Sequence, residues 1–123
     1  SSGRMAERAG VGGLVVRVAG TRWFIPVTGV IEVLREAVVA RVPGTPPAVR
    51  GMVNHRGRVL TVADPIRALG LSGDTGGEVD VVVVDAGGHR FAVAVDGVVE
   101  LAAEPRTGLA TLDLDQVASA IFA

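Results

Sequence analysis

The stretch VRGMVNHRGRVLTVAD, residues 49–64, is the clearest structural signal in this 123-residue chain. Its two apolar runs, at 49–54 and 59–64, flank a four-residue segment, 55–58, that contains a glycine. Valine and other β-branched residues fit a pleated surface, and a short glycine-containing connection between two such runs favours a tight turn. The stretch therefore predicts a β-hairpin.

Apolar runs bounded by turn residues recur on both sides of this hairpin and predict further strands. These strands are expected at residues 14–18, 23–27, 38–42, 79–84, 90–95 and 98–101. Residues 30–34 suit either a short helix or a strand, and the periodicity of their apolar positions does not decide between them.

Two short helices are also predicted. Asp64 and Pro65 have the chemistry of an N-cap and a first helical position, and Gly70 ends that helix. Near the end of the chain, apolar residues recur at helical spacing, so a C-terminal helix is expected to pack on the sheet. Its apolar face consists of Leu114, Val117, Ala118 and Ile121.

The composition agrees with a β-rich fold. Valine supplies 24 residues, whereas Phe and Trp together supply four and Tyr none, and 17 Gly and six Pro are available for turns. We therefore predict an all-β protein of two lobes with short helices. A polar link at 72–77 separates lobe 1, about 14–71, from lobe 2, about 78–123. Residues 1–13 are interpreted as a tag remnant and a flexible N-terminus.

The charge balance excludes several classes of function. The chain has twelve Arg, no Lys and thirteen acidic residues, which argues against a nucleic-acid partner. Cysteine is absent, so neither a disulfide framework nor a thiolate metal site is expected. No apolar run approaches the roughly 20 residues that span a bilayer, so we expect no direct membrane insertion and a cytoplasmic location.

A search for catalytic groups finds no convincing constellation, so we predict no enzyme, no cofactor and no metal. The serines do not lie in a nucleophile elbow. His55 and His89 both lie beside predicted turns and are expected to be exposed turn residues, without the close spacing of metal ligands. Asp64, Asp85 and Asp96 stand where aspartate caps a helix or makes a turn. Binding of another protein, in a groove between the lobes or at a sheet edge, is the function that these features favour.

Residues 14–64 resemble the first half of the CheW-like domain of bacterial chemotaxis. The likeness rests on the Phe24-Ile25-Pro26-Val27 strand, on Pro43 to Pro47 and on the hairpin with its Asn-x-Arg-Gly pattern at 54–57. The second half continues it with Phe91 to Val98, which includes a Val-Asp-Gly turn. The resemblance therefore covers nearly the whole chain.

The resemblance implies two small SH3-like five-stranded β-barrels packed side by side. It also implies a non-enzymatic adaptor that couples methyl-accepting chemotaxis receptors to a CheA-type histidine kinase, and recruitment to membrane receptor arrays. The alternative is a stand-alone β-barrel binding or scaffold module outside chemotaxis. Matched position by position, the residues implied in binding the kinase or the receptor are Val30, Glu32, Gly51, Arg56, Val81 and Val82.

The chain departs from the family pattern in three places, of which Pro65 is expected to be harmless at the first turn of a helix. His55 and Pro65 each stand where leucine is usual. The chain after Leu101 is shorter than in the family, which puts one strand of the second lobe in question. The strand at 98–101 then needs cover, either from the C-terminal helix acting as a lid or from a homodimer through the shortened second lobe.

Overall fold

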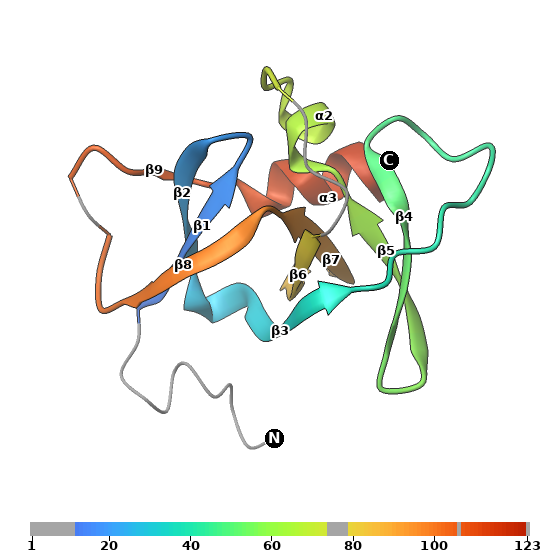
Figure 1. Cartoon of the computed structure of the whole chain (residues 1–123), viewed down its shortest axis with the longest axis horizontal. Coiled ribbons are helices and arrows are strands. Elements are labelled where there is room, and N and C mark those ends of the chain that lie inside the picture. The colour runs from blue at the N-terminus through green and yellow to red at the C-terminus, as the bar shows by residue number, and fades with distance from the viewer. Residues whose placement is uncertain (1–11, 74–78, 106, 123) are drawn as a thin grey trace.

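The computed structural model describes residues 12–73, 79–105 and 107–122 (Figure 1). The described residues form strands in two sheets, with short helices between them. The strands are β1 (Gly13–Val18), β2 (Thr21–Pro26), β3 (Val30–Ala37), β4 (Val49–His55), β5 (Arg58–Ala63), β6 (Val79–Ala86), β7 (His89–Val95), β8 (Gly97–Ala102) and β9 (Ala110–Thr111). The helices are η1 (Val27–Gly29), α2 (Pro65–Leu69) and α3 (Leu114–Phe122).

The protein is all-β with short helices, as predicted, and residues 30–34 lie in a strand and not in a short helix. The strand order is β8-β1-β2-β9 in a four-stranded sheet and β3-β6-β7-β5-β4 in a five-stranded sheet. In Figure 1 the four-stranded sheet lies on the left, β4 and β5 lie on the right, and β6 and β7 lie between them.

Both sheets combine strands from either side of the predicted boundary between the lobes at 14–71 and 78–123. The late strand β8 pairs with β1, and the early strand β3 pairs with β6. The physical reason lies in β6, whose residues are apolar on both faces. A strand of that kind needs a neighbour on each side and cover above and below, and β3 and β7 supply the neighbours.

The five-stranded sheet closes through one short contact between its edge strands. Past the end of β3, Ala40 exchanges two backbone hydrogen bonds with Met52 of β4, at 2.9 and 2.8 Å. The strand predicted at 38–42 is therefore reduced to a single bridge. Gly51 lies under this crossing, and a Cβ atom there would come within 2.3 Å of the Ala40 carbonyl oxygen. This close approach is why the position needs glycine.

The buried residues form three clusters, and β6 contributes to the two larger ones, while Val15, Phe24 and Ala102 form the third. Val82 and Val84 pack between the two sheets with residues such as Phe91, whereas Val81 and Val83 fill the interior of the five-stranded barrel. Successive side chains of a strand point to opposite faces, so one valine run serves both cores. Each fully buried valine contributes about 1.5–3 kcal/mol relative to an exposed one.

Helix α2 follows the prediction closely. The Asp64 carboxylate accepts a hydrogen bond of 3.0 Å from the Ile66 amide, Pro65 occupies the first helical position, and Gly70 ends the helix with a φ of 69°. None of the helices among the described residues is long and apolar enough to span a bilayer.

Helix α3 forms as predicted but takes a different position. Its buried residues, Val117 and Ala118, join the core between the sheets, and the helix packs principally against α2 and β6. The prediction that α3 covers residues 98–101 as a lid was therefore wrong. Strand β8 remains at the edge of the four-stranded sheet. Phe122, near the helix end, stacks on the His89 ring with centroids 4.1 Å apart.

Two predicted segments lie mostly outside the described residues. Of the expected tag remnant and flexible N-terminus at 1–13, only the last two residues are described. Gly13 begins β1, and the Gly12 amide donates a 2.8 Å hydrogen bond to the Ala102 carbonyl. Of the link predicted at 72–77, residues 74–77 are likewise outside the described residues.

Candidate functional site

The β4–β5 hairpin extends away from the body of the sheets (Figure 1). His55 pairs with Arg58, which leaves Arg56 and Gly57 as a two-residue turn. Both have a positive φ, 52° for Arg56 and 82° for Gly57, as a type I′ turn requires. The Asn54 side-chain oxygen accepts a 3.0 Å hydrogen bond from the Gly57 amide. The Asn-x-Arg-Gly pattern is therefore turn chemistry, because each residue has a defined part in this bend.

Arg56 is unusual because it is a non-glycine residue in the left-handed region. That conformation costs roughly 1–3 kcal/mol. Its side chain, 76% exposed, turns back to β3, and its Nε donates to Glu32 Oε1 at 3.1 Å. The turn thus holds a charged, accessible side chain at a fixed place on the surface.

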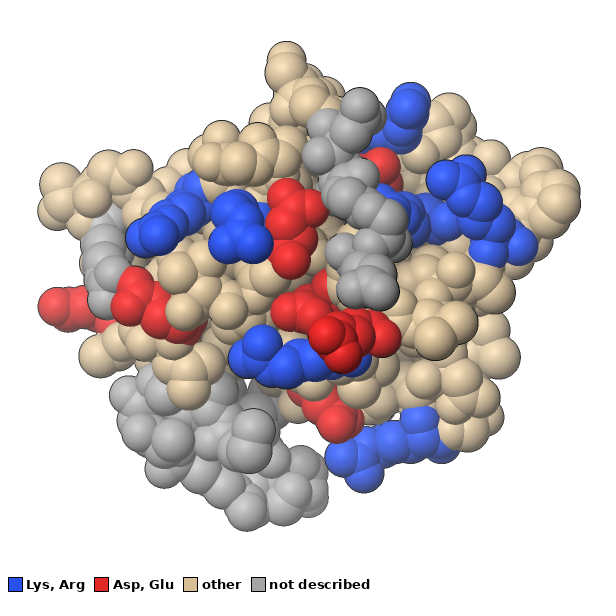
Figure 2. Space-filling model, viewed as in Figure 1, with Lys and Arg blue, Asp and Glu red and all other residues tan. Residues whose placement is uncertain are grey.

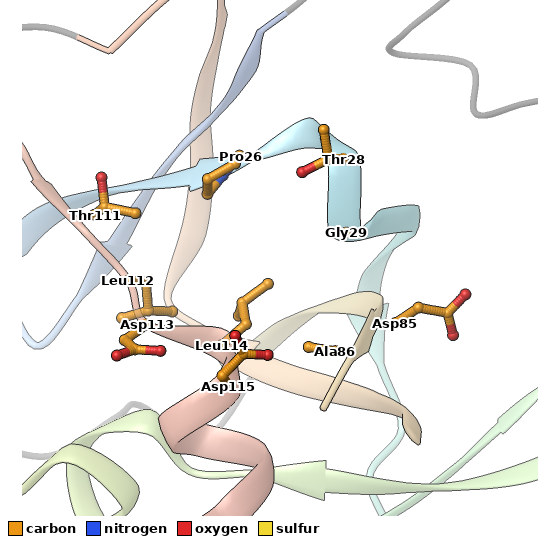
Figure 3. A pocket seen from close by; sticks show the side chains of 10 residues that line it. All are labelled: Pro26, Thr28, Gly29, Asp85, Ala86, Thr111, Leu112, Asp113, Leu114 and Asp115. Atoms are coloured by element: carbon orange, nitrogen blue, oxygen red, sulfur yellow. The ribbon is translucent and has the colours of Figure 1, made fainter. Parts of the chain in front are cut away.

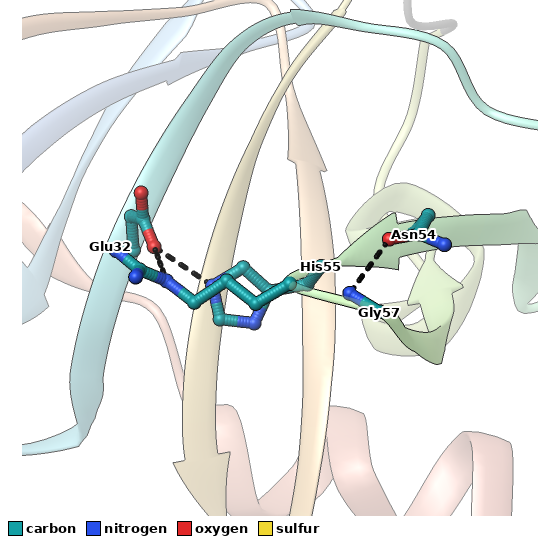
Figure 4. Close-up of polar contacts among 5 residues, drawn as sticks. Glu32, Asn54, His55 and Gly57 are labelled. Carbon is teal, nitrogen blue, oxygen red and sulfur yellow. Dashed lines mark hydrogen bonds and ion pairs between the residues drawn. The ribbon is translucent and has the colours of Figure 1, made fainter.

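His55 bonds to the same carboxylate oxygen of Glu32. Its Nε2 lies 2.8 Å from Glu32 Oε1, and its side chain is only 6% exposed (Figure 4). The prediction of an exposed turn residue was wrong for His55, although His89 is exposed. The side chain of His55 faces inward because β4 residues alternate and Val53, two positions earlier, also faces the barrel interior.

Glu32 is held in its ionised form by these two neighbours. The hydrogen bond from His55 and then that from Arg56 lower the pKa of Glu32, while partial burial opposes them. A carboxylate only accepts hydrogen bonds, so Nε2 of His55 carries the proton and donates. We refer to Glu32, His55 and Arg56 as the Glu32 cluster. The cluster joins β3 to β4 by side chains, and the Ala40–Met52 bridge joins the same two segments by backbone.

The structure separates the six residues implied by the resemblance into two kinds. Glu32 and Arg56 are brought together at the surface. The other four residues are buried: Val30, Gly51, Val81 and Val82. A partner that docks on the surface therefore does not contact their side chains directly. Val30 is paired with Val84 and belongs to the core between the sheets.

A sheet face beside the Glu32 cluster was not singled out from the sequence. Asn54 pairs with Val59, and Met52 pairs with both Thr61 and Ala40, so their side chains share the outer side of the sheet. Val38 and Val42 stand two positions before and after Ala40 in the chain, and Val38 and Val59 are 88% and 69% exposed. We call this set the hairpin face: Val38, Ala40, Val42, Met52, Asn54, Val59 and Thr61. The sequence did contain a signal for this face. Val53 and Leu60 face inward, so the residues that alternate with them along β4 and β5 must face outward.

A concave region lies between η1, the end of β6 and the start of α3 (Figure 3). Its volume is about 460 Å³, and three carboxylates line it. Each carboxylate already has a structural partner. Asp113 accepts from the Gln116 amide, Asp115 accepts from the Gly87 amide, and Asp85 pairs with Arg90. Within residues 12–73, 79–105 and 107–122, no cluster of His, Asp and Glu could hold a metal ion.

Three comparisons with known proteins agree with this architecture. The family model described as CheW-like domain matches residues 12–117. Protein FrzA of Myxococcus xanthus is 42% identical over 53 residues, which are 43% of this chain and 33% of that protein. The chain thus matches about one third of the length of this curated relative. The scaffolding protein TtCheW of Thermoanaerobacter tengcongensis has a similar fold, with a TM-score of 0.66 and 23% sequence identity. That likeness covers 84% of this chain and 75% of the other.

Proposed function

Because the chain belongs to the CheW-like domain family, we propose that it is a non-enzymatic adaptor that couples methyl-accepting chemotaxis receptors to a CheA-type histidine kinase. The family match over residues 12–117 carries this proposal. It implies that the protein works in the cytoplasm, recruited to membrane receptor arrays. No cofactor is needed for such a role, because an adaptor only holds two partners at a defined distance and orientation.

Two features of the hairpin support a docking role for this part of the molecule. A type I′ turn braced by Asn54 presents Arg56 rigidly, and rigid presentation lowers the entropy cost of binding. The hairpin face beside it combines exposed valines with neighbouring arginines, a composition found at protein interfaces. We assign contact with the kinase to Arg56, Glu32 and this face. Of the buried residues, Gly51 allows the close approach to Ala40 and Val81 packs in the interior of the five-stranded barrel, whereas Val30 and Val82 lie in the core between the two sheets.

The proposal is tested by assembly from purified components. The full chain is mixed with the regulatory domain of a CheA-type kinase and the cytoplasmic signalling segment of a receptor, and complexes are measured by size-exclusion chromatography with light scattering. We expect a three-component complex that does not form when the chain is omitted. If neither component binds, the protein is a binding module outside chemotaxis.

A further inference from the structure

Helix α3 is attached to the β6–β7 turn, residues 87–88, by contacts that are not ion pairs. On the face shown in Figure 2, many charged side chains lie beside side chains of the opposite charge, and exposed ion pairs contribute little to stability. The contacts of α3 with the turn are instead aromatic, apolar or made to a backbone amide. Because α3 follows β9 of the four-stranded sheet in the chain, these contacts tie one sheet to the other.

The turn and the strand that follows it meet one face of α3 at both ends of the helix. In the first turn of α3, Asp115 Oδ1 accepts a hydrogen bond of 3.1 Å from the Gly87 amide. At the last residue of α3, the Phe122 ring stacks on the His89 ring, with centroids 4.1 Å apart and planes inclined by 18°. Asp115 and Phe122 are about two helical turns apart, so they lie on the same side of the helix.

The middle of α3 lies directly against the backbone of the same turn. Gly87 has a φ of 59°, and a Cβ atom at this position would lie 3.0 Å from the Ala118 Cβ. Ala118 and Val117 are buried in the core between the sheets. Phe122 also packs edge-on against the buried Phe91, with ring centroids 5.8 Å apart. The helix therefore covers apolar residues that the sheets alone would leave open.

A helix as short as α3 is not stable without such contacts. Isolated helices shorter than about 12–15 residues are marginal in water, so the nine residues of α3 depend on tertiary contacts for their helical form. The ends of a short helix ordinarily open first, because their backbone groups have the fewest partners. In α3 the first turn is held by the Asp115 hydrogen bond and the last residue by the stacked rings, so neither end can unwind before the other.

We propose that α3 is a strap that opens and closes as one unit while the strands of both sheets stay paired. Its clasp consists of the Asp115–Gly87 hydrogen bond and the Phe122–His89 ring contact. Because the clasp holds both ends, the helix detaches in a single step, and the detached segment loses its helical form. The sheets survive this step because α3 supplies no strand to either of them. The open state uncovers Phe91, and this behaviour is independent of the adaptor function proposed above.

Native-state hydrogen exchange, measured by NMR at low urea concentrations, tests whether the strap opens by itself. We expect the hydrogen-bonded amides of α3 to share one free energy of opening, lower than that of the slowest amides in β6 and β7. The variant Val53→Ala, in the interior of the five-stranded barrel, should raise the exchange rates of β6 and β7 about 10–100-fold, because global unfolding breaks the contacts of Val53. The rates of α3 should not change in this variant, because opening of the strap leaves those contacts intact.

Variants of the clasp test what holds the strap closed, and they change exposed side chains so that the fold is retained. His89→Ala should raise the exchange rates of α3 about 2–10-fold, but it should have no further effect in a Phe122→Ala background. Asp115→Ala removes the acceptor and should raise the rates by a similar factor, whereas Asp115→Asn keeps a side-chain carbonyl oxygen and should have a smaller effect. The matched control is Gln116→Ala, an exposed position on the same helix, which should leave the rates unchanged.

Three results would overturn the proposal. If the α3 rates rise together with those of β6 and β7 in Val53→Ala, the helix opens only in global unfolding. If the wild-type rates increase steadily towards Phe122, the helix frays from its end and does not open as a unit. If His89→Ala leaves the α3 rates unchanged, the ring contact does not hold the strap.

Discussion

Arg56 combines a costly backbone conformation with an exposed charge. Asparagine or glycine would occupy the first turn position more cheaply, because both tolerate a positive φ. The bond from Arg56 to Glu32 offsets part of that cost. Residues that keep an unfavourable conformation often do so where a partner is bound, which agrees with the proposed role of this side chain.

Replacing Arg56 by glutamate should weaken kinase binding with little effect on folding. We expect binding to weaken by roughly 2–4 kcal/mol, because a charge-assisted bond is replaced by repulsion. The free energy of unfolding should fall by about 1 kcal/mol, because the introduced carboxylate is exposed but stands beside that of Glu32. Calorimetric titration and thermal melting measure the two effects, with Arg22→Glu as the control. Unchanged binding would remove Arg56 from the site.

His55 makes the stability of the protein depend on pH through Glu32. The fold lowers the pKa of Glu32, so its contribution is fully present above the ordinary glutamate pKa of about 4.3 and is lost as pH falls through the folded value. The hydrogen bond from His55 is the largest cause of this shift. Because Glu32 is about a third exposed, the effect should be about 1 kcal/mol at most.

The substitution His55→Leu tests this coupling. It fills the buried position with an apolar side chain of similar size and removes the hydrogen-bond donor. The pKa of Glu32 should therefore rise, and the acid-induced loss of stability should become shallower. Arg56→Gln should have a smaller effect, because the bond from Arg56 ranks second. Carboxyl NMR titration and urea denaturation across acidic pH give the two readouts. An unchanged pKa in His55→Leu would contradict the proposed coupling.

At the scale of elements, β3 contributes core residues as well as the Glu32 cluster. Val30 is 4% exposed and opposes Val84. Substitution by aspartate places a charge in the core, and we expect the cooperative melting transition to disappear. Val30→Ala should remain folded with a loss of about 2 kcal/mol. A folded Val30→Asp protein by circular dichroism would show that this part of β3 is a surface.

Helix α3 is needed to complete the core between the sheets. Truncation after Asp113 removes the buried Val117 and Ala118, and it uncovers Phe91, against whose ring Phe122 packs edge-on. We expect a loss of several kcal/mol or aggregation, since each large apolar side chain contributes about 1.5–3 kcal/mol when buried. Thermal melting and light scattering measure the outcome. A monomeric truncated protein with an unchanged Tm would show that the helix is dispensable.

At the scale of the whole molecule, the two sheets depend on each other. β1 needs β8, and β3 needs β6, although each pair is separated by much of the chain. We therefore expect residues 14–71 and residues 78–123, expressed separately, to remain unfolded, because each fragment leaves apolar strands without partners. Amide NMR dispersion measures this, and mixing the two fragments should restore it if pairing drives folding. A fragment that is folded alone would indicate independent lobes.

Sequence reasoning was most successful where the deciding interactions are local. The hairpin at 49–64, the caps of α2 and the apolar face of α3 all depend on residues a few positions apart, and each was predicted from such spacing. The resemblance in turn indicated the family that the comparison identifies. Residues 38–42 were misjudged because local apolar content does not reveal whether a partner strand lies alongside.

The sequence by itself determined most of the segments that become strands and how the hairpin turns, because backbone propensity and turn chemistry act over neighbouring residues. Tertiary structure alone decided which strands pair, and this moved β8 beside β1 and buried Val30, Val81 and Val82. It also brought Glu32 to His55, 23 positions away, and so turned an expected surface histidine into part of the barrel seam. Such contacts depend on the register of distant strands, which no local pattern specifies.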